Sequence, residues 1–314
     1  MSEAAVPAHP DDPAIAAAAE AEPPARLMVA IGLLRHDRGA LVGLVILALF
    51  VLAAAFAPLL APYDPLAQRI GHGFLDPGPG HWLGTDEYGR DLASRIIYGA
   101  RPALVIGVLS VLVSISIGVP VGMLAGYHMG LVDRVVGTIV DIMLALPSLL
   151  LALMIVALLG ASTGTLVAAI GIAHVPIFIR LARGSTLVVR QLDYVSQART
   201  FGAGTVHILF RHILPNISGP LIIMATLSIA GAVREEASLS FLGLGVQPPY
   251  PSWGNLIRDG VANVLTAPLL AVLPGAALTL AVLAFNLIGD ALRDMLDPRD
   301  LTAGTRGAAG RPMR

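Results

Sequence analysis

Several ionisable side chains lie inside or beside long apolar stretches, where an isolated charge is costly and a retained one is often functional. They are Asp141, His174 and the consecutive Arg234, Glu235 and Glu236. His174 could relay protons or contact a solute, or it could be a neutral side chain that bonds to a neighbouring helix. Asp141 is predicted to serve helix packing or gating near one end of its stretch. The three consecutive charges are compatible with solute binding or with a water-exposed local ion pair.

Two other groups have the residue types of reactive sites. Segment 160–164 reads GASTG, the GxSxG spacing of a nucleophile elbow, which requires a strand-to-helix turn. It lies between two apolar stretches with no strand before it, so we predict a turn, and hydrolysis at Ser162 has no His–Asp partnership to support it. A set of possible metal ligands matches no established metal signature, and we expect a solvated acidic patch. This set is His81, Asp86, Glu87 and Asp91.

The residue types that are missing exclude further chemistry. Cysteine is absent, which excludes disulfides, thiolate–zinc sites and a cysteine nucleophile. All 20 basic residues are arginine, so the chain has no lysine for a phosphate-binding P-loop or a Schiff base. The net charge of −1 gives little support for a nucleic-acid partner. ATP hydrolysis of the P-loop type would therefore have to take place on another protein.

The composition is that of a membrane protein. Of the 314 residues, 56% are hydrophobic and only 13% are charged, and the mean hydropathy is +0.78. A membrane-spanning helix needs roughly 20 consecutive apolar residues, and the stretches between charges provide six such spans, both ends of each being uncertain by a few residues. The predicted spans are about 39–60, 102–126, 136–159, 165–182, 213–235 and 269–289.

The distribution of arginine predicts the orientation of these spans. With both termini in the cytoplasm, 14 of the 20 arginines lie on the cytoplasmic side, as the positive-inside rule requires. Asp141 then lies close to the cytoplasmic end of the third span. The segments between the spans follow: a disordered tail (1–25), an interfacial segment (26–38), outer loops (61–101 and 242–268), a cytoplasmic loop (183–212) and a cytoplasmic tail (301–314).

The cytoplasmic loop carries a helix–turn–helix pattern. Asp193 can cap a short helix whose apolar face contains Tyr194, Val195, Ala198 and Phe201. Gly202 and Gly204 can end this helix, and Thr205 can cap a second one with Val206, Leu209, Phe210 and Ile213 on one face. Such a unit could pack on its own bundle. It could also dock a cytoplasmic partner by inserting a helix into a groove.

This loop resembles the EAA loop of binding-protein-dependent ABC importer permeases, in which Glu-Ala-Ala is followed by Gly and by a hydrophobic residue with Leu-Pro. Gly202 and Ile213-Leu214-Pro215 fit, whereas Ser196-Gln197-Ala198 stands where the family has Glu-Ala-Ala. Further segments resemble the second, C-type permease of the dipeptide, oligopeptide and nickel subfamily. They are LAPYDP at 60–65, GTDEYGRDLASRIIYGAR at 84–101, VDIMLALPSLLLAL at 140–153, EASLSFLGLGVQPPYPSWGN at 236–255 and FNLIGDALRDMLDPR at 285–299.

The resemblance implies an all-α, polytopic, type I importer-like permease domain over 39–300, in a bacterial or archaeal inner membrane. It implies a homologous second permease, two ATPase subunits that hold ATP and magnesium, and an extracytoplasmic solute-binding protein. The chain itself would be non-catalytic, without a cofactor or a metal. Its ATPase-docking residues would be Asp193, Tyr194, Ser196, Gln197, Ala198, Arg199, Gly202, Ala203, Leu214 and Pro215, and its gating or pathway residues Asp141, His174 and Glu236.

Peptides are the first expectation for the solute, and nickel or another small solute is the alternative. An ion-coupled secondary transporter is a competing hypothesis, although the sequence shows no inverted repeat and His174 is its one clear midplane ionisable residue.

Overall fold

The computed structural model describes residues 38–296. The predicted tails 1–25 and 301–314 lie outside these residues, as does the interfacial segment 26–38 except for Arg38. Within the described part the chain is helical, with two isolated β-bridges near the outer loop and no strand. This agrees with the composition, because a helix satisfies every backbone polar group within its own segment when it crosses lipid.

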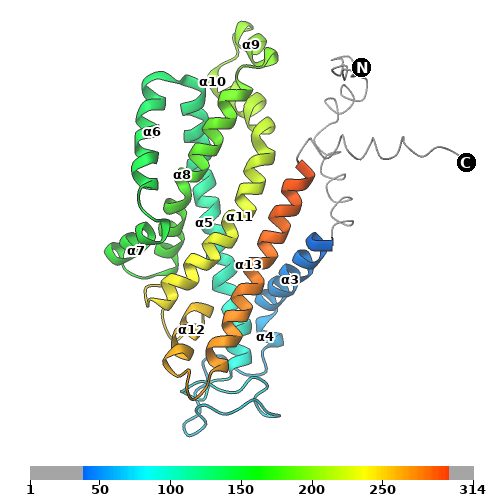
Figure 1. Cartoon of the computed structure of the whole chain (residues 1–314), viewed down its shortest axis with the longest axis vertical. Coiled ribbons are helices and arrows are strands. Elements are labelled where there is room, and N and C mark those ends of the chain that lie inside the picture. Colours follow the sequence, from blue (N-terminus) through cyan, green and yellow to red (C-terminus); the bar gives the residue numbers. More distant parts are fainter. Residues whose placement is uncertain (1–37, 297–314) are drawn as a thin grey trace, which may run out of the picture.

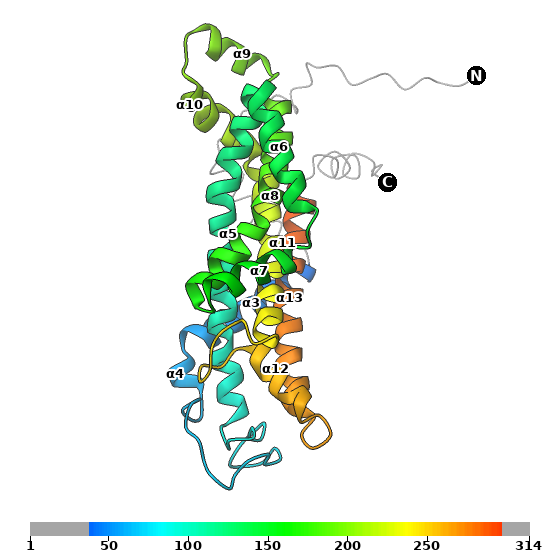
Figure 2. The same cartoon turned by 90° about the vertical axis from the view of Figure 1, so that its left-hand side faces the viewer.

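The helices lie mostly side by side along the long axis of the molecule, as Figures 1 and 2 show. In chain order they are α3 (Arg38–Ala55), α4 (Ala57–Leu60), α5 (Leu92–His128), α6 (Gly130–Leu144), α7 (Ser148–Leu159), α8 (Thr163–Val189), α9 (Asp193–Thr200), α10 (Thr205–His207), the π-helical η1 (Ile208–Ile213), α11 (Leu214–Phe241), α12 (Trp253–Ala262) and α13 (Leu269–Leu296).

Five long helices are apolar enough to cross a membrane, and the bent pair of α6 and α7 could supply a sixth crossing. The sequence predicted one continuous helix over 136–159, and this was wrong, because α6 and α7 meet at 88°. Pro147 explains the break: proline has no N–H to donate, and its ring disfavours the α conformation of the residue before it.

The other helices extend beyond the predicted spans. α5 begins at Leu92, inside the predicted outer loop 61–101, and α8 continues to Val189, inside the predicted cytoplasmic loop 183–212. α11 and α13 also run past the predicted ends at 235 and 289. The outer segment 242–268 contains α12, which was not predicted. These errors share one cause, since charges marked the predicted ends whereas helices continue through charged residues that find partners or water.

The closest helix pair, α5 and α8, is joined by a row of small residues. Gly118, Gly122 and Gly126 lie four residues apart on one face of α5. A Cβ atom at these positions would lie 2.5–2.7 Å from atoms of α8, namely those of Phe178, Ile179 and Arg183. Only glycine allows this approach, which is the small-xxx-small packing of membrane helices.

Candidate functional site

The predicted coupling loop and the predicted outer loops lie at opposite ends of the molecule. In Figure 1, α9 and α10 lie at the upper end, and α12 and the loop before α5 lie at the lower end. Other polar contacts join helices of the bundle, such as α6 with α8 and α7 with α11. The structure therefore separates the sequence-predicted residues into three regions: the coupling-loop end, the bundle interior and the outer end.

At the coupling-loop end, α9 is attached through one apolar side chain. Val195 is buried, and α9 packs on η1. Asp193 is the first helical residue, not the cap: the N-cap is Leu192, and it makes no side-chain hydrogen bond. Asp193 still places a negative charge in the first helical turn, where it is favourable to the helix dipole. Partial burial raises the pKa of the Tyr194 phenol, so this group stays neutral at physiological pH.

The turn after α9 has the predicted geometry. Gly202 has φ +82°, its N–H donates to the carbonyl of Arg199, and the N–H of Ala203 donates to the carbonyl of Ala198. This pair of bonds is a Schellman motif, which ends a helix at a residue in the left-handed region. The prediction that Gly202 terminates the helix is confirmed, whereas its role in coupling stays a prediction.

The second helix of the loop differs from the prediction. Thr205 does not cap it, since the N-cap is Gly204 and no side-chain cap bond forms. The chain continues without interruption from α10 through η1 into α11. The π-helical turns of η1 precede Pro215, whose missing N–H removes one α-helical hydrogen bond. Leu214 and Pro215 thus open α11 and join the coupling loop directly to a long bundle helix.

The loop exposes a cluster of large apolar side chains, which we call the tip patch. Phe201 is 89% exposed, and Val206 and Phe210 are also exposed. The two predicted apolar faces are therefore split: Val195, Leu209 and Ile213 are buried, and the remaining large side chains face outward. The tip patch also includes Tyr194. Exposed apolar groups that gather beyond the bundle are typical of a protein-binding surface.

The acidic pair on α11 is buried. The sequence favoured a water-exposed ion pair near the end of this span, and this was wrong, because α11 continues to Phe241 and both Glu235 and Glu236 are buried. Within the described residues no ion pair joins either acid to the exposed Arg234. Glu236 accepts a hydrogen bond from the Ser240 hydroxyl (2.7 Å). These carboxylates are thus held by helix neighbours.

Glu235 connects three helices. One of its oxygens accepts a hydrogen bond from the Ser148 hydroxyl at the start of α7 (2.6 Å). The other lies 3.7 Å from Nδ1 of His174 on α8. His174 Nδ1 also lies 3.0 Å from the Ile170 carbonyl of its own helix. The Glu235 carboxylate therefore lies beside the first turn of α7, a helix start that has no side-chain cap hydrogen bond. The sequence predicted a His174 that bonds to a neighbouring helix, but the hydrogen-bond contact of Nδ1 is to its own helix and Glu235 on α11 lies at 3.7 Å.

Asp141 lies in the last turn of α6, near the break before α7 and not near the start of the helix at Gly130. Its carboxylate is 2.8 Å from the Arg180 guanidinium on α8, and the two side chains are 72% and 61% exposed. Asp133 and Arg183 form a second, bidentate pair between the same helices. A groove of about 710 Å³ runs along these residues. Charges this exposed require water or a protein partner beside them and not lipid tails.

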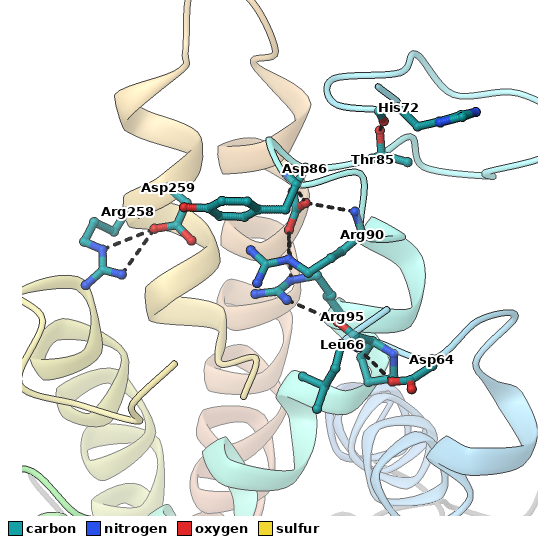
Figure 3. Close-up of polar contacts among 11 residues, drawn as sticks. Asp64, Leu66, His72, Thr85, Asp86, Arg90, Arg95, Arg258 and Asp259 are labelled. Atoms are coloured by element: carbon teal, nitrogen blue, oxygen red, sulfur yellow. Dashed lines mark hydrogen bonds and ion pairs between the residues drawn. The ribbon is translucent and has the colours of Figure 1, made fainter. Parts of the chain in front are cut away.

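At the outer end, the predicted solvated acidic patch is wrong. Asp86 is buried and accepts hydrogen bonds from Nε of Arg90 (2.6 Å) and from the backbone N–H of Arg90 and of Tyr88. Nε of Arg95 lies 3.4 Å from the same carboxylate. Figure 3 shows Asp86 facing the guanidinium groups of both arginines. The carboxylate is therefore an internal anchor of the outer loop.

Asp91 and His81 are likewise buried and structural, whereas Glu87 is exposed, as the predicted acidic patch requires. Asp91 accepts bonds from the backbone N–H of Ser94 (2.8 Å) and from its hydroxyl (2.7 Å), which caps α5. Its other oxygen lies 2.9 Å from Nδ1 of the buried His81. Among the described residues no group of three or more potential ligands could hold a metal ion. Ser162 accepts a hydrogen bond from the N–H of Thr165 (3.1 Å) as the N-cap of α8, so the predicted turn is confirmed.

Sequence patterns give no indication of Ser148, because its partner Glu235 lies 87 residues away. They give none of Arg95 either, because its contact with Asp86 depends on how the loop before α5 folds. The contact between α5 and α8 does have a local signal, the spacing of Gly118, Gly122 and Gly126.

The apolar bundle, with its projecting loop and ordered outer end, is the architecture of a membrane permease, and comparison with known proteins defines its class. Residues 118–300 match the family model described as "Binding-protein-dependent transport system inner membrane component". Residues 29–77 match the N-terminal TM domain of oligopeptide transport permease C. The chain belongs to this permease family, and it is a multi-pass protein of the bacterial inner membrane. Family membership implies partnership with an ATPase and with a binding protein.

Similar proteins narrow the class to peptide-type permeases. The chain is 44% identical over 268 residues to "Glutathione transport system permease protein GsiD" of Pectobacterium atrosepticum, covering 85% of this chain and 88% of the relative. It is 46% identical over 270 residues to "Di/tripeptide transport system permease protein DppC" of Pseudomonas aeruginosa, covering 84% and 89%. It is thus similar over most of its length to C-type permeases of ABC importers.

A solved structure supports the fold alone. The MetNI methionine ABC transporter in an inward-facing conformation has a chain that superposes with a TM-score of 0.54 at 18% identity, over 65% of this chain and 97% of that chain.

Proposed function

We propose that this permease forms one half of a pathway that carries peptides inward, in a complex with a homologous second permease and two ATPase subunits. It would cross the membrane six times, with both termini in the cytoplasm. The observation that carries the proposal is the tip patch, because an ABC importer permease needs a surface that meets its ATPase, and here exposed aromatic side chains lie on a loop joined directly to α11.

The coupling step follows from this connection. α9 would sit in a cleft of one ATPase, and the turn at Gly202 would hold the helix at a fixed angle. ATP binding closes the two ATPase subunits, and the displacement would reach α11 through η1. The pathway would then alternate between two arrangements biased by ATP and by the loaded binding protein. Ser196 and Gln197 offer hydrogen bonds in place of the ion pair that the family's glutamate could make.

ATP and magnesium would be held by the ATPase subunits, and this chain would be non-catalytic and bind no cofactor. Peptides are proposed as the solute because the similar permeases are named for dipeptide, tripeptide and glutathione transport. Nickel or another small solute is the alternative within the same family. The exposed pair Asp141–Arg180 and the half-buried pair Asp133–Arg183 suit the wall of an aqueous pathway.

The transport proposal can be tested in proteoliposomes that contain the complete transporter and its loaded binding protein. We expect these vesicles to take up a radiolabelled dipeptide. This uptake should require ATP on the side of the membrane that carries the ATPase subunits, and a protonophore should not affect it. Uptake that persists without ATP and stops when the proton gradient collapses would instead favour an ion-coupled secondary transporter. Uptake of nickel but of no peptide would assign the alternative solute.

The orientation can be tested with single cysteines, because the natural chain has none. Ile70→Cys in the outer loop and Val206→Cys in the tip patch both alter exposed side chains. In intact cells an impermeant maleimide should label Ile70→Cys and leave Val206→Cys unlabelled until the membrane is opened. The reverse pattern would overturn the orientation and the docking of the tip patch to a cytoplasmic ATPase.

A further inference from the structure

The outer end contains a pocket that the fold does not fill. Its volume is about 120 Å³, and the segment before α5, the loop after α11 and helix α12 line it. The exposed rings of Tyr88 and Tyr250 stand at its rim, and the buried Arg90 and Arg95 lie at its floor. Asn255 completes the wall from α12. The pocket is therefore open to the outside and has a cationic floor.

The charges at the floor are unequal. Arg90 and Arg95 share the single buried carboxylate of Asp86, which can balance only one of them. Nε of Arg95 is buried and makes no hydrogen bond within the described residues. A guanidinium carries five N–H donors arranged to grip a planar anion, so a donor left without an acceptor here is costly. The floor thus lacks one acceptor group with a negative charge.

The other charged residues do not fill this need. Arg258 and Asp259 are consecutive residues of α12 and form their own ion pair at 3.2 Å, and Figure 3 shows them apart from the two buried arginines. Glu87 is exposed, and no ion pair joins it to Arg90 or Arg95 among the described contacts. Glu87 and Asp259 line the pocket but make no hydrogen bond to Arg90 or Arg95 among the described contacts, so an acceptor from outside the chain would complete the hydrogen bonding of these two arginines.

We propose that this pocket receives an aspartate or glutamate side chain of the solute-binding protein, and that the contact fixes how the loaded partner docks. The inference rests on the proposed function. A cavity of about 150 Å³ holds a molecule the size of benzene, so 120 Å³ has room for a side-chain carboxylate but not for a whole dipeptide. Helix α12 and the loop before α5, which line the pocket, lie at the end of the molecule opposite the coupling loop (Figure 1), where the binding protein would dock.

The contact has a predictable character. A carboxylate beside two buried guanidinium groups forms charge-assisted hydrogen bonds, which are the strong ones. Electrostatic attraction at an interface also accelerates association, and this effect weakens as salt increases. The affinity of the binding protein for the transporter should therefore increase as the ionic strength falls. This salt dependence should be lost when the pocket is altered.

A matched pair of substitutions at the rim tests the proposal without disturbing the core. Tyr250 is 64% exposed, so Tyr250→Glu and Tyr250→Gln should both fold. Tyr250→Glu places a carboxylate of the chain's own beside the pocket, where it competes with the incoming one. We expect Tyr250→Glu to weaken docking of the binding protein to the complete, nanodisc-held transporter by at least about tenfold, and Tyr250→Gln to change it much less. Fluorescence anisotropy of a labelled binding protein measures both.

A second pair probes the floor. Arg95→Gln should weaken docking about as much and remove most of its salt dependence, whereas Arg69→Gln, an exposed arginine of the same loop outside the pocket, should not. Equal docking by wild type, Tyr250→Glu and a folded Arg95→Gln would reject the carboxylate pocket. The variants could instead dock normally but lose uptake of peptides with a free C-terminal carboxylate while keeping uptake of the corresponding amides. That result would assign the pocket to the solute and would also overturn the proposal. If no binding protein docks to the wild-type transporter, the proposed function itself fails.

Discussion

Phe201→Asp is expected to detach the ATPase while leaving the permease folded and inserted. Phe201 is 89% exposed, so the folded chain loses no core contact. In the docked state the ring would be buried in the ATPase, where a Phe side chain contributes about 1.5–3 kcal/mol, and a charged replacement would also have to be desolvated. We expect the dissociation constant for the ATPase to increase by at least about 100-fold, and dipeptide uptake to be lost. Binding of the purified ATPase to the detergent-solubilised permease measures this.

Leu265→Asp is the matched control, because Leu265 is equally exposed but lies in the turn between α12 and α13, at the outer end. It should bind the ATPase normally. Phe201→Leu should keep most of the affinity. If Phe201→Asp co-purifies with the ATPase as well as wild type does, the tip patch is not the docking surface.

The turn offers an independent variant of the same experiment. Gly202 has φ +82° and open space around it, so Gly202→Val introduces backbone strain of about 1–2 kcal/mol without a clash. Docking should weaken by less than with Phe201→Asp, because the apolar side chains remain. Ser196→Glu, which restores the family's acid, should be tolerated or should tighten docking if the ATPase cleft keeps a basic residue. A normal transport rate for Gly202→Val would show that the angle of α9 does not matter for coupling.

Gly122→Leu is expected to destabilise the bundle severely. A Cβ at Gly122 would lie 2.5 Å from the carbonyl oxygen of Ile179, which is backbone and cannot rotate away. α5 and α8 would have to separate along their whole contact, with a loss of stability of about 3 kcal/mol or more. The measured result should be a lower melting temperature of the detergent-solubilised protein and faster proteolysis.

Gly137→Leu provides the comparison for this substitution. Gly137 also lies in a helix, α6, but nothing lies within 4 Å of the position that its Cβ would take. Leucine there should leave the melting temperature nearly unchanged or raise it slightly, since leucine is the better helix former. Equal stability of the two variants would mean that α5 and α8 are not held at the distance the structure gives.

The sequence by itself determined the class of the protein and its modular order. Apolar stretches of the length of a bilayer have few alternatives to a helix, so the spans could be located from the distances between charges. The absence of lysine excluded a P-loop in this chain, and the turn at Gly202 could be predicted because only glycine adopts a positive φ without strain. These properties are local: each depends on residue types within a few positions of one another.

The tertiary structure alone decided which polar groups are buried and with what. Asp86 and Glu235 look like exposed charges in the sequence, but Arg90, Arg95 and Ser148 surround them after folding. The break between α6 and α7 by 88° and the buried Nε of Arg95 that makes no hydrogen bond among the described residues are also properties of the folded chain. The physical reason is that the free energy of a buried charge depends on the groups packed around it. For Glu235 those groups come from helices far apart in the sequence, and for Asp86 they are brought together by the folding of one loop.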